Sequence, residues 1–327
     1  MRIVDAHCDA LTKLALNERL DFDREQEELD VCFPRLRQAG VKVQLFAMYV
    51  SESIRNSGFD HILHMIDVFN RKIGRHPQMQ IIRTSEDWLK VEASSKIGAI
   101  LTLEGLDALG GNLAYIRLLH ELGVRAIGLT WNYANWAADG VMEPRNGGFT
   151  RKGRGMLKEL ESLGIIVDVS HLSVAAFWEL TNVYPKPFIA SHSNAQAHCA
   201  HPRNLSDDQI KAIITCKGMM GLTFVPYFVE SGKEHVPISA LLNHIDHVCA
   251  LGGEKHIGFG SDFDGIEQWM VNLRHTGDYA NIREALSKSY TETQVEAFLY
   301  GNWRRFMVAN LPRCKNPDQS NFDMDTI

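Results

Sequence analysis

The sequence predicts a (β/α)8 TIM barrel, in which eight parallel strands alternate with helices and close into a cylinder. Eight short, mostly continuous apolar runs recur along the chain, as expected for parallel strands covered on both faces. Stretches with helical apolar spacing lie between these runs, and we find no internal repeat that would suggest a solenoid or propeller. Because single α/β barrels often reach 327 residues, we expect one domain over residues 1–327.

The predicted strands are the apolar runs themselves, taken in chain order. We place them at residues 2–6, 41–49, 99–103, 126–130, 165–170, 188–191, 219–225 and 257–261. Another apolar run, at residues 79–82, lies in the long segment between the second and third strands. We interpret that segment as an elaborated crossover within the barrel and not as a separate domain.

Helix patterns and helix-boundary signals fill the segments between the strands. A helix over residues 59–73 is predicted by the spacing of Ile62, Leu63, Ile66, Phe69 and Ile73. Two later apolar stripes end at Gly123 and Gly164, and glycine commonly terminates helices. The starts of two further helices are marked by capping boxes: Ser206 with Gln209, and Thr291 with Gln294. From about residue 312 we expect an irregular tail.

Composition and charge exclude several kinds of partner. The net charge of −6 argues against nucleic acid or an anionic membrane as the natural partner. We find no secretory leader and no apolar stretch long enough to span a membrane. The six cysteines lack CxxC spacing, which favours reduced thiols and a cytoplasmic location. The sequence leaves open whether the chain forms a homodimer.

Chemically active side chains follow the predicted strands, at the carboxyl ends where barrel enzymes carry their active sites. His7 and Asp9 come directly after the first strand, and alternation along an extended chain points both to the same side. Later strands are followed by Glu104, Trp131 with Asn132, His171, His192 and Asp262. Three histidines and three carboxylates from five strands are therefore expected to meet at one end of the barrel.

This set of side chains predicts a metal site. Imidazole and carboxylate ligands together favour Zn²⁺ or a similar divalent ion. The expected ligands, which are too many for one open catalytic zinc, are His7, Asp9, Glu104, His171 and His192. They suit two ions bridged by Glu104, with a bridging hydroxide as the nucleophile. Asp262 would then take the proton of the nucleophile and return it to the leaving amine.

Any one of these histidines, taken alone, is more often a structural residue than a ligand, so the prediction depends on the set. Other histidines supply the contrast because they sit three residues apart on predicted outer helices. We expect these to be surface or helix-packing residues: His61, His64, His244 and His247.

Several motifs resemble those of the renal (membrane) dipeptidase family. They are DAHCD at 5–9, LEG at 103–105, VSHLS at 169–173, SHSNAQAHCAHPRNLSDD from 191 and GSDFDG at 260–265. GNWRRF at 301–306 is similar to the last helix of the family, so the resemblance covers nearly the whole chain. It implies a bacterial-type soluble member with an amidohydrolase-like, metal-dependent barrel and two zinc ions. His7, Asp9 and Glu104 would hold one ion, and Glu104, His171 and His192 the other.

The resemblance also assigns the remaining site residues. Arg203 matches the arginine that grips the free carboxylate of a dipeptide, and a guanidinium suits that role because it pairs bidentately with carboxylates. Asp262 matches the acid/base of the eighth strand. The implied substrate is a small dipeptide, with a D-residue tolerated at its C-terminal position.

One position departs from the family pattern. The animal enzymes carry a substrate-contacting histidine after the fourth strand, in an LTH motif, whereas this chain reads LTWN with Trp131 at that place. Tryptophan donates one hydrogen bond but cannot carry a proton. Asn132 could supply an oxyanion-type donor instead. The change leaves the metal chemistry intact and bears on substrate range, pH profile and rate.

Two alternatives to a dipeptidase stay open at this point. The first is another binuclear-metal amidohydrolase, such as a deaminase, lactonase or phosphotriesterase. Many such barrels bridge their metals with a carboxylated lysine, and the absence of a lysine at these strand ends favours the dipeptidase. The second is a catalytically silent metal-binding barrel. Serine hydrolase, thermolysin-like and P-loop motifs are all missing from the sequence.

Overall fold

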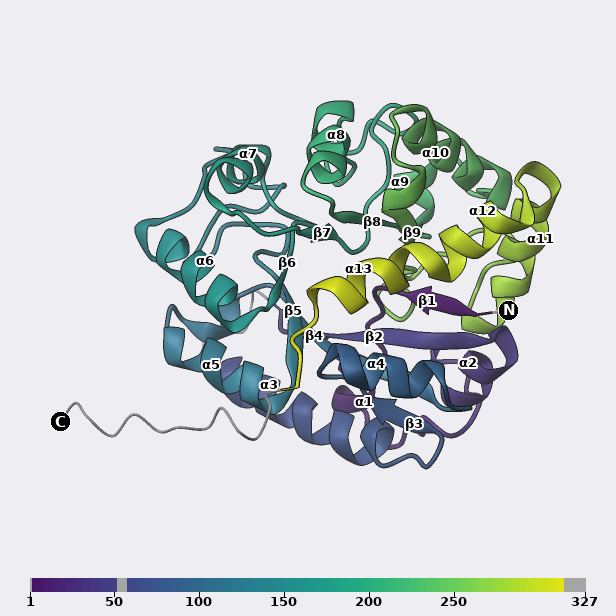
Figure 1. Ribbon diagram of the computed structural model, residues 1–327, viewed down its shortest axis with the longest axis horizontal. Coiled ribbons are helices and arrows are strands. Elements are labelled where there is room, and N and C mark those ends of the chain that lie inside the picture. The colour runs from purple at the N-terminus through teal and green to yellow at the C-terminus, as the bar shows by residue number, and fades with distance from the viewer. Residues whose placement is uncertain (1, 52–57, 315–327) are drawn as a thin grey trace.

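A closed parallel barrel forms the centre of the computed structural model, which describes residues 2–51 and 58–314 (Figure 1). Its strands are β1 (Ile3–Asp5), β2 (Val41–Tyr49), β4 (Ile97–Glu104), β5 (Val124–Gly128), β6 (Ile166–Asp168), β7 (Ile189–Ala190), β8 (Met219–Leu222) and β9 (Ile257–Phe259). Each strand pairs in parallel with the next, and the pairing of β1 with both β2 and β9 closes the cylinder. The predicted TIM barrel is confirmed.

Each predicted strand overlaps an observed one, but several predicted runs extend past the hydrogen-bonded ladder. The run at residues 165–170 contributes only Ile166–Asp168 to the sheet, and the run at residues 219–225 only Met219–Leu222. The remaining residues of those runs leave the sheet and enter the loops at the carboxyl end of the barrel.

The run at residues 79–82 forms a further strand, β3 (Met79–Ile81), which was not among the eight predicted ones. It pairs with the first residues of β4, Ile97 to Ala99. Strand β5 takes over that edge of β4 from Leu101 onward, so β3 lies beside the barrel and is not part of its closed ring.

Helices surround the strands (Figure 1). The α-helices are α1 (Ala10–Leu16), α2 (Phe33–Ala39), α3 (Gly58–Val68), α4 (Ser85–Glu92), α5 (Leu113–Leu122), α6 (Arg151–Leu163), α7 (Val174–Val183), α8 (Asp207–Thr215), α9 (Pro226–Val229), α10 (Ile238–Ala250), α11 (Tyr279–Ser289), α12 (Glu292–Glu296) and α13 (Asn302–Asn310). Short 3₁₀ or π turns are η1 (Phe69–Gly74), η2 (Asp107–Leu109), η3 (Glu254–His256), η4 (Thr276–Asp278) and η5 (Ala297–Gly301).

The predicted helix boundaries agree with the structure at the positions that carried a capping signal. Helices α5 and α6 end at Gly123 and Gly164, both in the left-handed conformation. Helices α8 and α12 begin with the expected capping boxes. The helix predicted over residues 59–73 is observed as α3 followed by the π-helical turn η1, and Leu63 of its apolar stripe is 40% exposed.

Helix α13 closes one end of the barrel. Side chains inside the cylinder, such as Val4, Val43 and Ile100, belong to the same buried cluster as Trp303 and Phe306 of α13. The indole of Trp303 is fully buried and donates a hydrogen bond to the carbonyl of Phe259 (3.2 Å). With one end packed in this way, the carboxyl ends of the strands form the other, functional end.

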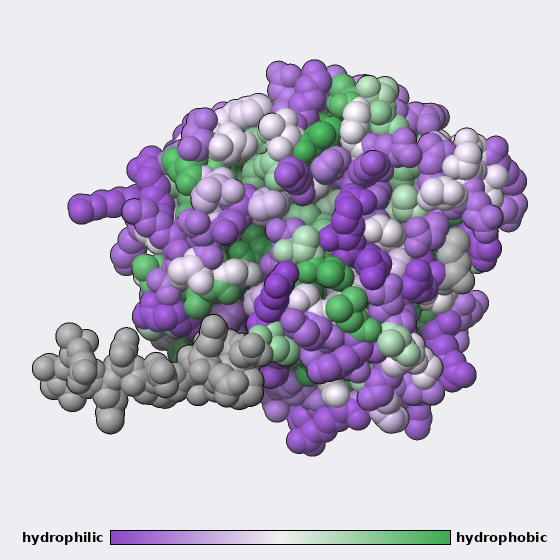
Figure 2. Space-filling model, in the orientation of Figure 1, coloured by the Kyte–Doolittle hydropathy of each residue, from purple (hydrophilic) through white to green (hydrophobic). Residues whose placement is uncertain are grey.

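In the described ranges we find no helix long and apolar enough to cross a membrane. On the face drawn in Figure 2, hydrophobic residues form small groups separated by hydrophilic ones. All six cysteines are unpaired thiols. Most of the tail expected to be irregular, residues 315–327, lies outside the described residues.

His244 of α10 is fully buried, although it was expected at a surface or helix contact. Its Nδ1 atom accepts a hydrogen bond from the amide of Ala195 (3.1 Å), and Nε2 donates to the carbonyl of Val229 (3.0 Å). The ring in its neutral form therefore joins the loop that contains Ala195 to the end of helix α9. Burial lowers the pKa of His244 to about 4, because it removes water from the charged form of the ring, and the nearby His198 and His247 add to the shift.

We predict that His244 makes folding stability depend on pH. Its folded pKa is below the unfolded value, so its contribution is complete above about pH 6.5 and is lost as the pH falls toward 4. Between pH 7 and pH 5 this loss amounts to about 2 kcal/mol. Urea unfolding at both pH values should show that His244→Gln reduces the pH dependence by this amount, whereas exposed His61→Gln does not. Equal pH dependence in wild type and His244→Gln would contradict the prediction.

Candidate metal centre and substrate pocket

Four ionisable side chains meet directly above strands β1, β4 and β9. His7 and Asp9 follow β1, Glu104 is the last residue of β4, and Asp262 follows β9. The Nε2 atom of His7 lies 3.4 Å from Asp9 Oδ2, 3.7 Å from Glu104 Oε2 and 3.7 Å from Asp262 Oδ1. The loops are joined through their backbones, since the amide of Asp262 donates to the carbonyl of His7 (3.2 Å).

A second group of donors shares Glu104. His171 and His192 follow β6 and β7, and their Nε2 atoms are 2.9 Å apart. The Oε1 atom of Glu104 lies 2.9 Å from Nε2 of His171 and 3.4 Å from Nε2 of His192. Glu104 therefore presents one oxygen to His7 and the other to this histidine pair. The structure brings together all six histidines and carboxylates that were read from the strand ends.

These donors fit divalent metal ions. The Nε2 atom of His7 is buried and has no hydrogen-bond partner, although three carboxylates surround it. Donor atoms of His7, Glu104 and His192 converge within 4.8 Å of one another, as do those of His7, Asp9 and Asp262. A buried nitrogen lone pair and several buried carboxylates would be costly without a cation or protons between them.

The pKa values of these groups indicate that the cluster lacks positive charge. Burial raises the pKa of Glu104 to about 8, with the Asp9 and Asp262 carboxylates adding to the shift and His7 opposing it. Burial likewise raises the pKa of Asp262 to about 6. Burial alone would lower the pKa of His7, but Glu104, Asp9 and Asp262 outweigh it and raise that pKa to about 10. Bound cations would take the place of these protons.

Backbone strain occurs at two of these positions. His171 and Asp262 have φ angles of 69° and 67°, in the left-handed region that non-glycine residues rarely occupy. The carbonyl of His171 is fixed by hydrogen bonds from the Val141 amide (2.7 Å) and the Thr130 hydroxyl (3.1 Å). The surrounding loops thus hold His171 in a conformation that turns its ring back toward Glu104.

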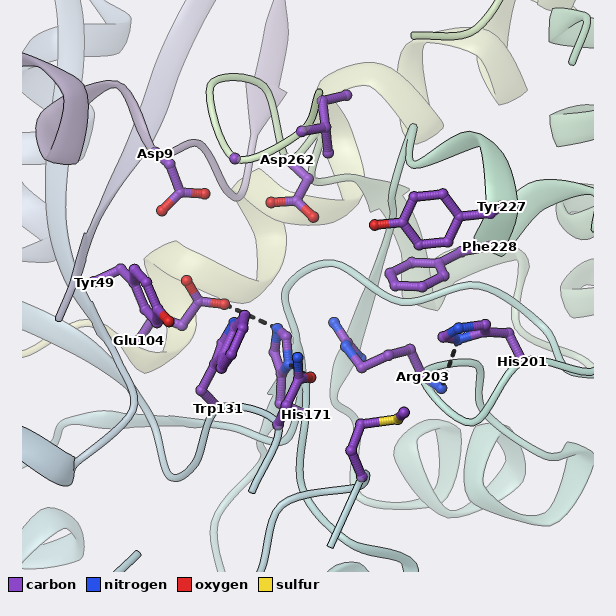
Figure 3. A pocket seen from close by; sticks show the side chains of 14 residues that line it. Asp9, Tyr49, Glu104, Trp131, His171, His201, Arg203, Tyr227, Phe228 and Asp262 are labelled. Atoms are coloured by element: carbon purple, nitrogen blue, oxygen red, sulfur yellow. Dashed lines mark hydrogen bonds and ion pairs between the residues drawn. The ribbon is translucent and has the colours of Figure 1, made fainter. Parts of the chain in front are cut away.

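A pocket of about 290 Å³ opens beside the cluster (Figure 3). It is lined by Asp9, Tyr49, Glu104, Trp131, Asn132, Met142, His171, His201, Arg203, Tyr227, Phe228, Asp262, Gly265 and Ile266. Two pairs of aromatic rings face it from different elements. Tyr49 and Trp131 have ring centroids 5.1 Å apart, and Tyr227 and Phe228 of α9 have centroids 4.7 Å apart.

Arg203 lines this pocket together with several of the metal donors. It is buried, and its Nη2 atom donates to the carbonyl of His192 (3.1 Å). Its Nε atom has no hydrogen-bond partner, and among the described residues no carboxylate forms an ion pair with it. Arg203 therefore keeps buried donors free for an anionic group in the pocket.

Trp131 and Asn132 both line the pocket. Trp131 packs against Tyr49 and stands 6.0 Å, between ring centroids, from His171. The Oδ1 atom of Asn132 lies 2.9 Å from Nδ1 of His171. The Asn132 oxygen is thus engaged with the His171 ring, and the oxyanion-type role of its amide stays a prediction.

Several lining residues were missed by sequence reasoning. Tyr49 is the last residue of β2, so the strand-end rule could have found it. Tyr227 and Phe228 lie on the four-residue helix α9, which follows the run predicted as the seventh strand, and no pattern marked it.

A parallel barrel with carboxylate and histidine donors at its strand ends defines the class of metal-dependent hydrolase barrels. Comparison with known families identifies the member of this class. The model of the family described as membrane dipeptidase (peptidase family M19) matches residues 1–316. The chain belongs to this metallopeptidase family, as its motifs predicted.

Individual relatives agree with this assignment. The chain is 30% identical over 302 residues to the dipeptidase aclJ of Aspergillus oryzae, covering 88% of this chain and 71% of that protein. Its fold matches the crystal structure of dipeptidase AC, a metallopeptidase, with a TM-score of 0.87 and 25% identity over 95% of this chain and 98% of the other. A metallopeptidase from Rhodobacter sphaeroides matches with a TM-score of 0.84 and 24% identity, covering 95% and 99% of the two chains.

We predict that Gly265 must remain a glycine for the centre to bind metal. A Cβ atom at this position would overlap Asp9 Oδ2 and lie 2.8 Å from Asp262 Oδ1. Gly265→Ala should therefore displace both carboxylates and weaken binding of added Zn²⁺ or Co²⁺, by about 100-fold if a carboxylate moves by 1 Å. Gly155→Ala on α6, where an added Cβ meets nothing within 4 Å, is the control. Metal titrations that give the same affinities for both variants would contradict this.

Proposed function

We propose that this chain is a zinc-dependent dipeptidase that hydrolyses dipeptides carrying a free C-terminal carboxylate. The observation that carries the proposal is the buried guanidinium of Arg203, which has an unused donor and no acidic partner beside the cluster of metal donors. A buried guanidinium that forms no ion pair is unfavourable, and a substrate carboxylate would supply the missing partner.

Arg203 would also set substrate length. A guanidinium reads a carboxylate through directed, charge-assisted hydrogen bonds, and its distance from the metal donors is fixed by the tie to His192. A peptide whose carboxylate sits on Arg203 would place one bond near the cluster, so only one residue would follow the scissile bond. Because Arg203 reads the carboxylate and not the side chain, we propose that a D-residue is tolerated there.

Two zinc ions are the cofactors that we propose. His7, Asp9 and Glu104 would hold one, and Glu104, His171 and His192 the other. When bound, such ions act as Lewis acids and generate a nucleophile from water near neutral pH. The donor set supports this, since Glu104 presents a separate oxygen to each group.

Asp262 is the residue that we propose for proton transfer. Among the three carboxylates around His7 its side chain is the most exposed, at 15% against 10% for Asp9 and 8% for Glu104. It lines the pocket and can therefore reach both the attacking water and the leaving amine. Asn132 and Trp131 would contact the substrate from the opposite side of the pocket.

The alternative reactions have less support. No lysine lines this pocket within the described residues, so a carboxylated lysine has no place here as a metal bridge. Deaminases, lactonases and phosphotriesterases also need no guanidinium aimed at a carboxylate. The Rhodobacter sphaeroides relative was solved with a phosphinate mimic of L-Ala-D-Ala, which makes that dipeptide a suitable first substrate.

We predict that Arg203→Met lowers kcat/KM for L-Ala-D-Ala by about 100-fold, since a charge-assisted pair worth about 3 kcal/mol is lost. For wild type, kcat/KM should fall by a similar factor when the substrate carboxylate is replaced by a carboxamide. For Arg203→Met, kcat/KM should be nearly the same for the two substrates. Arg154→Met, which removes an exposed arginine paired with Glu179, is the matched control. If Arg203→Met still prefers the carboxylate, the proposed role of Arg203 is wrong.

We predict about two zinc ions per chain by elemental analysis, and loss of dipeptide hydrolysis on chelation with recovery on adding zinc. Metal binding should also raise the melting temperature, because the ions bind the folded cluster and offset its buried carboxylates. A metal-free protein that hydrolyses dipeptides at the same rate would contradict the proposal. Two bound metals with turnover of nucleosides, lactones or phosphate esters, but not of dipeptides, would favour the alternative amidohydrolase. Bound metal without any turnover would favour a silent barrel.

A further inference from the structure

A buried chain of hydrogen bonds lies behind the second donor group and involves two residues with no role so far. Asp168 ends β6, Ser191 follows β7, and the parallel pairing of Asp168 with Ile189 brings them together. The Ser191 hydroxyl contacts Asp168 Oδ2 on one side and lies 2.8 Å from Nδ1 of His192 on the other. All three side chains are buried, with relative exposures of 8%, 2% and 1%.

The other oxygen of Asp168 is fully used by the backbone. Its Oδ1 atom accepts hydrogen bonds from the amides of Ser170 (3.0 Å) and Ser191 (2.9 Å). These two contacts hold the carboxylate in one orientation, with one oxygen toward the backbone amides and the other turned away from them. Oδ2 is therefore the atom that must face Ser191.

The direction of each hydrogen bond follows from the number of protons. A serine hydroxyl has a single proton, which it donates to the Asp168 carboxylate. Its oxygen must then accept from Nδ1–H of His192. This selects the tautomer in which Nε2 of His192 carries a lone pair, and that atom faces Glu104 and His171.

We propose that Asp168 and Ser191 are positioning residues that present His192 to the second metal ion. The inference rests on the proposed metal centre and extends it to two residues that bind neither metal nor substrate. The ring orientation of both histidines in this group would be fixed by a hydrogen bond at Nδ1. For His171 the partner at Nδ1 is the Oδ1 atom of Asn132. The carboxylate of Asp168 reaches the ring of His192 through the Ser191 hydroxyl.

Two substitutions test this hydrogen-bond relay from Asp168 through Ser191 to His192. They differ in their effect on which nitrogen of the His192 ring carries the proton. In Ser191→Ala, Nδ1 of His192 loses its partner, and we expect the second ion to bind about 10–100-fold more weakly. In Asp168→Asn, the amide oxygen would keep the two backbone contacts and the NH₂ group would face Ser191. The hydroxyl would then donate to Nδ1 and force the proton of His192 onto Nε2. Although nearly isosteric, Asp168→Asn should therefore weaken the second ion more than Ser191→Ala does.

The control is Ser193→Ala, which removes a serine of similar burial whose hydroxyl, among the described residues, contacts only that of Ser170, at 3.4 Å. Zinc titrations against a competing chelator should give two affinities for wild type and for this control. The affinity of the second site should fall in Ser191→Ala and should fall further in Asp168→Asn. The ion held by His7 and Asp9 should be retained in both variants. Wild-type affinities in both variants, or a larger loss in Ser191→Ala than in Asp168→Asn, would overturn the proposal.

A second readout separates this inference from the proposed function. Nitrogen-15 NMR of the histidine rings in metal-free protein reports the tautomer of His192 directly. We expect the Nδ1–H form in wild type and the Nε2–H form in Asp168→Asn. The same tautomer in both proteins would overturn the relay even if two zinc ions bind. The expected tautomers in a protein that binds no zinc would instead refute the metal centre and leave the hydrogen-bond relay standing.

Discussion

The site depends on one constraint, the burial of the Glu104 carboxylate between His7 on one side and the pair His171 and His192 on the other. One carboxylate oxygen faces His7 and the other faces His171 and His192, so a single residue of β4 joins ligands from three other strands. Such an arrangement is stable only where positive charge balances the carboxylates. Closure of the barrel makes it possible, because parallel strands deliver all their carboxyl ends to one place.

The rest of the fold offsets the unfavourable free energy of this buried, charged cluster. Left-handed backbone at His171 and Asp262 is unfavourable by itself, and the loops around each residue compensate through backbone hydrogen bonds. At the opposite end, Trp303 of α13 fills the barrel with apolar surface. The left-handed donors and the buried carboxylates of the cluster thus lie at the open end, while the closed end supplies hydrophobic stabilisation.

The sequence predicted what depends on position along a strand and missed what depends on contacts between loops. His7, Glu104 and Asp262 were found because each follows an apolar run, and the family motifs supplied Arg203. The partner of Asn132 and the link from Asp168 through Ser191 were not predicted, because each joins residues more than 20 positions apart. Strand β3 was missed because it pairs only with the start of β4, which a local pattern does not show.

His192 connects the two halves of the site. Its ring faces Glu104, while its backbone carbonyl accepts a hydrogen bond from Arg203. This tie holds the guanidinium near the carboxylates of Glu104 and Asp262 without an ion pair to either. If Arg203 paired with one of them, the cluster would lose a carboxylate for its metals and the pocket would lose its free donor. Keeping these opposite charges close but unpaired leaves the cluster in need of cations and Arg203 in need of an anion. The proposed dipeptide, bound together with metal ions, would satisfy both requirements at once.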